Sequence, residues 1–131
     1  MNPNTSITRW LAAAALAAAS LAGAPAALAH GTAKPAHGGV VQAASDLSFE
    51  LVTTPGGAAI YVVDHDKEAD ASRFGGKLTV LTGSEKSEAP LKAAGGNKLE
   101  ATGIALAKGS KVVASITTPA KKTVTVRFTV K

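Results

Sequence analysis

The stretch TVTVRFTV, residues 123–130, decides the fold class. Four apolar side chains alternate in it with three threonines and Arg127. Successive side chains of a β-strand point to opposite faces, so this strict period of two predicts a strand with one buried and one solvated face. We therefore predict a strand over 122–130 that places Val126 and Phe128 in a hydrophobic core.

The same alternation recurs along most of the preceding chain. Turn-forming pairs such as Pro55-Gly56 and Gly95-Gly96 separate the apolar runs. Short strands with turn signals at this spacing predict an all-β fold, a small antiparallel β-sandwich or barrel of seven to eight strands. We expect these strands near 39–43, 47–54, 58–64, 77–82, 88–93, 98–106, 111–118 and 122–130. The expected core residues are Phe49, Leu51, Ile60, Val62, Leu78, Val80, Val112, Ile116, Val126 and Phe128.

One segment, Lys67 to Ser72, reads as a helical turn inside an acidic loop. Neither an internal repeat nor a second domain is visible, so residues 39–131 are expected to form a single domain.

The first 29 residues have the organisation of a secretory signal peptide. Arg9 precedes an apolar, Ala-rich run over 10–22, which is long enough for a signal but short for a membrane-spanning helix. Ala27 and Ala29 supply the small residues that signal peptidase requires. We expect cleavage after Ala29 and release of a soluble periplasmic protein; the alternative is an uncleaved anchor.

Residues 30–38, HGTAKPAHG, are expected to form a flexible arm, poorly ordered unless something ties it down. Cleavage after Ala29 would make His30 the first residue. A terminal histidine can chelate a metal through its α-amine and Nδ1, because an α-amine with a pKa of about 8 loses its proton at little cost near neutrality. A third nitrogen from His37 or His65 would complete a site suited to Cu(II). The alternative is that these histidines are incidental.

A second candidate lies at Asp64-His65-Asp66, at the end of a predicted strand. A carboxylate beside a histidine can orient the ring or bind a cation directly. Since neighbours in a strand face opposite ways, Asp64 and Asp66 cannot both lie beside His65 while the strand continues. The segment lacks the glycine and closing glutamate of a calcium loop. A solvated strand-to-loop turn is the alternative.

Composition excludes several other functions. The chain has no cysteine, and its one methionine, Met1, would leave with the signal, so no sulfur ligand for Cu(I) remains. The formal net charge is +5 at pH 7, but the basic residues are scattered without aromatic interleaving, which together with export argues against nucleic acid. No motif of a hydrolase, zinc protease or phosphate-binding enzyme appears, so we expect no enzymatic activity.

Several short motifs resemble a known module. The residues His37-Gly38-Gly39-Val40-Val41, the run Phe49 to Val52 and the run Ile60 to Asp64 are similar to the small amino-terminal β domain of heavy-metal efflux periplasmic adaptor proteins. Gly76 to Leu81 and Val126 to Phe128 resemble its later strands. The resemblance covers roughly residues 36 to 130, and only His37 matches a residue that the module could use for metal. The hairpin, coiled-coil and lipoyl-like parts of a full adaptor are missing, so the resemblance implies a metal-handling accessory at most.

The sequence therefore favours a soluble periplasmic accessory protein that binds Cu(II) or Zn(II) and buffers the metal or delivers it to an efflux complex. The candidate ligands are His30, His37, His65, Asp64 and Asp66. After cleavage, no membrane contact is expected. The rival interpretation is a periplasmic interaction module whose edge strand or basic face docks an envelope partner, without metal.

Overall fold

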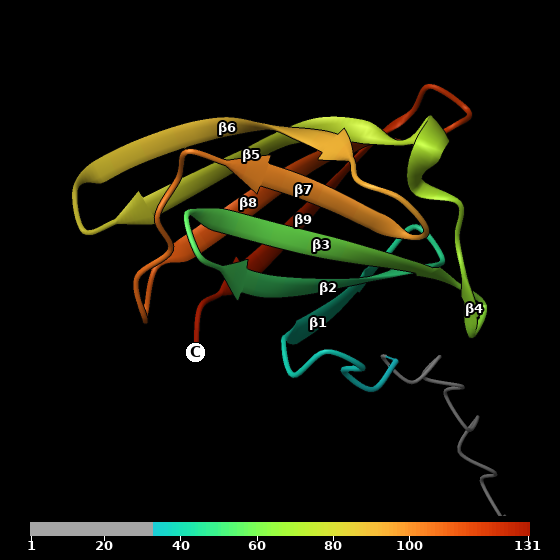
Figure 1. Cartoon of the computed structure of the whole chain (residues 1–131), viewed down its shortest axis with the longest axis horizontal. Helices are drawn as coiled ribbons and strands as arrows, with labels where there is room; N and C mark the ends of the chain where they lie inside the picture. Colours follow the sequence, from blue (N-terminus) through green and yellow to red (C-terminus); the bar gives the residue numbers. More distant parts are fainter. Residues whose placement is uncertain (1–32) are drawn as a thin grey trace, which may run out of the picture.

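A computed structural model describes residues 33–131 and is built almost entirely of β-strands (Figure 1). The only helical element in that range is a short 3₁₀ turn, η1 (Ala71–Arg73). None of the described segments is a helix long and apolar enough to cross a membrane. The predicted signal peptide and its cleavage site lie outside the described residues. The strands are β1 (Val40–Ala44), β2 (Leu47–Thr54), β3 (Gly57–Asp64), β4 (Lys67–Glu68), β5 (Gly75–Thr82), β6 (Glu85–Ala93), β7 (Lys98–Thr102), β8 (Lys111–Thr117) and β9 (Thr123–Thr129).

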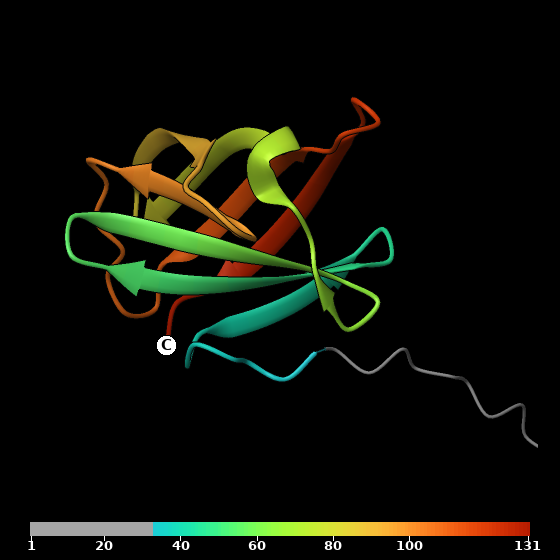
Figure 2. The same ribbon diagram turned by 45° about the vertical axis from the view of Figure 1, so that its right-hand side comes forward.

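The strands form one antiparallel sheet that curls into a nearly closed barrel (Figures 1 and 2). Its order is β1-β2-β3-β7-β6-β5-β8-β9, and β4 pairs with β3 beside this path. The first and last strands, β1 and β9, lie against each other, but no strand pairing joins them in the described part of the chain. The predicted all-β, sandwich-or-barrel class is confirmed.

The core lies inside this curled sheet. All ten residues predicted to be buried are buried there, and Phe49, Ile60 and Leu78 are fully inaccessible to solvent. Phe128 is 3% exposed. The period of two in the sequence thus assigned each of these side chains to the correct face.

Two local predictions need correction. The strand expected over 98–106 ends at Thr102, because Gly103 adopts a left-handed conformation (φ 71°) that ends the extended run. The helical turn expected over 67–72 is wrong at its start, where Lys67 and Glu68 instead form β4. Only Ala71–Arg73 is helical. Asp70 caps this turn, because its side chain accepts a hydrogen bond from the backbone N–H of Ser72 at 3.0 Å. This hydrogen bond lowers the pKa of the Asp70 carboxyl.

The register of β1, β2 and β3 places one row of side chains across the outer face of the barrel. Val41 pairs with Glu50, and Glu50 with Tyr61, so these three side chains are cross-strand neighbours. His65 and Asp66 form the hairpin turn between β3 and β4, and both have positive φ, as a tight two-residue turn requires. The candidate sites lie at this row, which the segment ahead of β1 with His37 crosses, and at this turn with Asp64 just before it.

Candidate functional site

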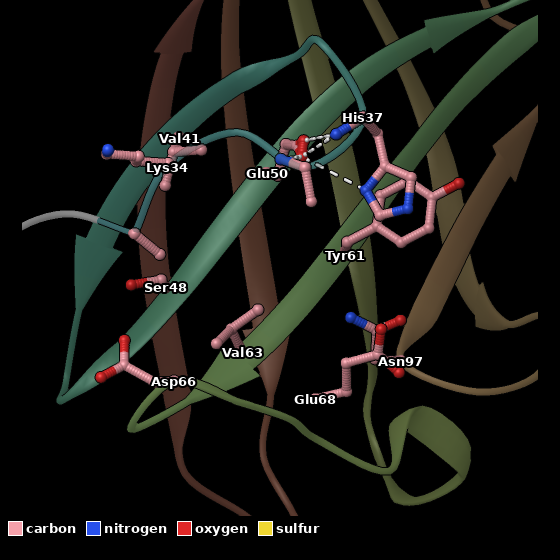
Figure 3. A pocket seen from close by; sticks show the side chains of 12 residues that line it. Lys34, His37, Val41, Ser48, Glu50, Tyr61, Val63, Asp66, Glu68 and Asn97 are labelled. Carbon is pink, nitrogen blue, oxygen red and sulfur yellow. Dashed lines mark hydrogen bonds and ion pairs between the residues drawn. The ribbon is translucent and has the colours of Figure 1, made fainter.

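Glu50 is a buried acid on the outer face of the barrel. Its neighbours on β2, Phe49 and Leu51, point into the core, so alternation directs Glu50 outward, where a carboxylate would ordinarily meet solvent. It is nevertheless only 5% exposed. The residues ahead of β1 run across this face and cover it (Figure 3).

The carboxylate of Glu50 fastens this segment. Ala36 donates its backbone N–H to Oε1 at 2.8 Å, and His37 donates its own to Oε1 and Oε2 at 2.8 and 2.9 Å. A charged acceptor shared by several backbone N–H groups forms strong hydrogen bonds in a site shielded from water. The end of the predicted flexible arm is therefore tied to the barrel at residues 36 and 37.

The imidazole of His37 is held by two contacts. Its ring stacks on that of Tyr61, with centroids 3.6 Å apart and planes 7° from parallel. Its Nδ1 lies 3.3 Å from Oε1 of Glu50. A carboxylate can only accept a hydrogen bond, so Nδ1–H is the donor in this contact, and in the neutral form of the ring the lone pair then lies on Nε2. The side chain remains 38% exposed, and Nε2 lies on the side of the ring away from Glu50 (Figure 3).

A cavity of about 260 Å³ adjoins this cluster. His37, Glu50 and Tyr61 line one part of it, and Asp66 and Glu68 line another (Figure 3). Over residues 33–131, however, no three His, Cys, Asp or Glu side chains come together closely enough to hold a metal ion. Within this range, His37 is a fixed histidine side chain that is not part of a complete metal centre.

The second predicted group is split between two places. Asp64 contacts Nδ1 of its neighbour His65, and both side chains are exposed, at 53% and 77%. They line a separate cavity of about 700 Å³, whereas Asp66 lines the cavity of His37. β3 ends at Asp64 and His65 and Asp66 form the turn that follows, so strand alternation does not continue through this segment. The structure does not bring His65 to His37, and metal binding at Asp64, His65 and Asp66 stays a prediction.

The remaining predicted ligand, His30, lies outside the described residues. Glu50 and Tyr61, by contrast, were missed by the sequence reasoning. The motif Phe49-Glu50-Leu51 looks like an ordinary strand with its acid facing water. What buries Glu50 is a segment more than ten residues upstream, so alternation within the strand carries no signal of it.

Comparison with known proteins adds no further assignment. The chain matches no protein-family model, no curated protein and no solved structure. Its similarity to the adaptor module therefore stays an expectation from short motifs.

Proposed function

We propose that this protein binds a divalent transition metal, Cu(II) or Zn(II), with His37 as its anchored ligand. It would act in the periplasm as an accessory that buffers the metal or delivers it to an efflux complex. The observation that carries the proposal is the fixed imidazole of His37, which has Nδ1 engaged by Glu50 and Nε2 open.

Metal-binding histidines commonly donate their second ring N–H to a carboxylate, which fixes the tautomer and raises the basicity of the ligating nitrogen. Glu50 has this relation to His37. Stacking on Tyr61 further restricts ring rotation. Both contacts reduce the entropy that the ring would lose on coordination, which supports a role as ligand over that of a freely rotating surface histidine.

A single imidazole binds neither metal tightly, so the site needs further donors. The sequence provides His30 seven residues upstream, with its imidazole and, after the expected cleavage, its α-amine. Three nitrogens of this kind suit Cu(II). The periplasmic role and the efflux partner rest on the predicted signal peptide and on the adaptor resemblance.

The test is titration of the exported, processed protein with Cu(II) and Zn(II) by calorimetry and, for copper, by electron paramagnetic resonance. We expect His37→Ala to weaken binding and change the copper spectrum. Glu50→Gln keeps the imidazole but removes its carboxylate partner, and we expect a loss of about 10-fold or more in affinity. Glu88→Gln is the matched control, since it neutralises an exposed carboxylate that does not line the cavity of His37, and it should bind metal as wild type.

Equal affinity and an identical copper spectrum for wild type and His37→Ala would refute the assignment of His37. Failure of the wild-type protein to bind either metal at micromolar concentration would refute the proposed function as a whole.

A further inference from the structure

One strand of the β5–β6 hairpin has a free edge. β6 pairs with β5 along residues 85–91, but it pairs with β7 only at Lys92 and Ala93. No other backbone hydrogen bond joins residues 85–91 to the described part of the chain. In Figure 1 the hairpin extends past the ends of the neighbouring strands, and residues 81–88 are all exposed. We call residues 85–91 the β6 edge, which is a template for a further strand.

The alternation of the backbone determines which residues present unpaired groups at this edge. Ala94, just after β6, donates its N–H to the carbonyl oxygen of Lys98 on the β7 side at 2.8 Å. Backbone groups of alternate residues in an antiparallel strand point to opposite neighbours, so the even-numbered residues of β6 point away from β5. At the β6 edge these are Lys86, Glu88 and Pro90, and a proline has no N–H. Among residues 85–91, therefore, a donor and an acceptor are both free at Lys86 and Glu88.

The side chains of Lys86 and Glu88 carry opposite charges on the same face, because every second residue of a strand points the same way. They contact each other, with Nζ 3.2 Å from Oε1, and Lys77 of β5 lies 3.5 Å from the same carboxylate. The hydrogen bond from Lys86 and the charge of Lys77 lower the pKa of Glu88, so this carboxyl is ionised at neutral pH. A positive and a negative charge thus follow one another along an open edge.

This order of charges is complementary to itself. When two copies pair antiparallel about a two-fold axis at Ser87, Lys86 of each copy lies opposite Glu88 of the other. Every backbone N–H and C=O group of these two residues then has a partner across the axis. A shift of the axis by one residue in either direction places Lys86 opposite its own copy or Glu88 opposite its own copy. Since like charges directly opposite each other are destabilising, one register is favoured.

The length of the free edge fits this register. Ser84, at the turn of one copy, lies opposite Pro90 of the other, so the added strand ends two residues before Lys92, where β7 takes over the edge. A proline and charged side chains ordinarily protect an edge strand from pairing. Here they block the neighbouring registers and leave this one open.

Other occupants match the β6 edge less well. Residues 1–32 contain no acidic residue, so this chain's own upstream segment cannot offer lysine and glutamate in alternation. A wholly acidic segment would place a like charge opposite Glu88, and a wholly basic one would do so opposite Lys86.

We infer that two copies of this protein associate through their β6 edges into one continuous sheet. Only residues 85–89 of each copy pair, so the interface is small compared with the roughly 1,200–2,000 Å² that stable complexes bury. We therefore expect a dimer at high micromolar protein concentration and a monomer at low micromolar concentration. The inference is independent of metal binding, because no residue of β6 lines the cavity of His37.

The experiment is sedimentation equilibrium of the exported, processed protein up to millimolar concentration, where wild type should show a monomer–dimer equilibrium. Lys86→Glu and Glu88→Lys each place like charges opposite each other at two positions, and each should weaken the dimer by about tenfold or more. A mixture of the two variants brings the substituted side chains opposite each other and the native ones likewise. The mixture should therefore dimerise as wild type, and so should the double variant Lys86→Glu/Glu88→Lys.

The matched control is Lys122→Glu, which makes the same change of charge as Lys86→Glu at an exposed lysine between β8 and β9 and should dimerise as wild type. A wild-type protein that stays monomeric at millimolar concentration would overturn the inference. So would equal weakening by Lys86→Glu and Lys122→Glu, or unchanged dimerisation of both edge variants. A mixture that dimerises no better than either variant alone would exclude this register and overturn it as well.

Discussion

Replacing Glu50 by glutamine tests the contact on which the candidate site depends. The substitution keeps the size of the side chain but puts an amide nitrogen where a carboxylate oxygen now accepts backbone N–H groups. Two backbone donors and Nδ1 of His37 converge on that carboxylate. An amide oxygen at the Oε1 position would still face all three donors but without a full negative charge, and the amide nitrogen would then lie against the His37 N–H that Oε2 now accepts.

The size of the expected loss in stability follows from the burial of the Glu50 carboxylate. Hydrogen bonds to a charged partner contribute about 1.5–3 kcal/mol each, and an unsatisfied buried donor costs about 1–3 kcal/mol. If the segment that covers Glu50 loosens in the variant, water can reach the freed N–H groups and hydrogen-bond to them. This limits the loss of folding free energy. We therefore expect Glu50→Gln to lower the free energy of unfolding by about 1–3 kcal/mol. With an m-value of about 1.5 kcal/mol/M in urea, a loss of 2 kcal/mol moves the midpoint by roughly 1.3 M.

The assay is urea unfolding combined with hydrogen exchange at the amides of Ala36 and His37, which should lose protection. Glu88→Gln is the control. Glu88 is an exposed carboxylate that Lys86 and Lys77 contact at 3.2 and 3.5 Å; the hydrogen bond from Lys86 and the charge of Lys77 lower its pKa. Since solvent screens these pairs, its loss should leave stability close to wild type. If Glu50→Gln matches Glu88→Gln in both stability and amide exchange, Glu50 does not fasten the segment and the reasoning is wrong.

Three further predictions concern the core, the approach to β1 and the metal. Phe128→Ala should cost about 3–5 kcal/mol in urea unfolding, because the ring is 3% exposed inside the barrel; a loss below 1 kcal/mol would contradict its place there. Gly39→Ala should cost about 1–3 kcal/mol, because a Cβ would collide with a backbone carbonyl of β2 and with the Glu50 side chain; wild-type stability would show that the segment can shift freely. One extra residue before His30 should weaken Cu(II) binding with every side chain unchanged, and binding to the unblocked protein should fall as the pH is lowered, because amine and imidazole ligands must be deprotonated to bind. Equal affinity with and without the extra residue would exclude ligation by the terminal amine.

The fold was predictable because it depends on a pattern within each strand. Val126 and Phe128 are assigned to the core by their own neighbours, without reference to the rest of the chain. Strand order was not predictable, since pairing β7 between β3 and β6 depends on contacts that local alternation does not encode. The two-residue strand β4 was missed for the same reason, because it exists only through its pairing with β3.

The candidate site was predictable only in part. His37 stood out by residue type and by the two glycines that follow it, but its partners did not. Tyr61 looks like a strand aromatic and Glu50 like a solvated acid. Their role appears only when register places them side by side and the upstream segment crosses over them.

The geometry also determines which part Glu50 can take in metal binding. Both of its oxygens already accept N–H groups of Ala36 or His37, and Oε1 faces Nδ1 as well. Using the carboxylate as a direct ligand would release these donors in a buried place, which costs more than leaving it as the partner of His37. Glu50 therefore suits an orienting role, with Nε2 of His37 as the group presented to a metal. Because the described residues offer no cluster of three ligands, the strength of binding then depends on donors outside residues 33–131, and His30 is the one that the sequence provides.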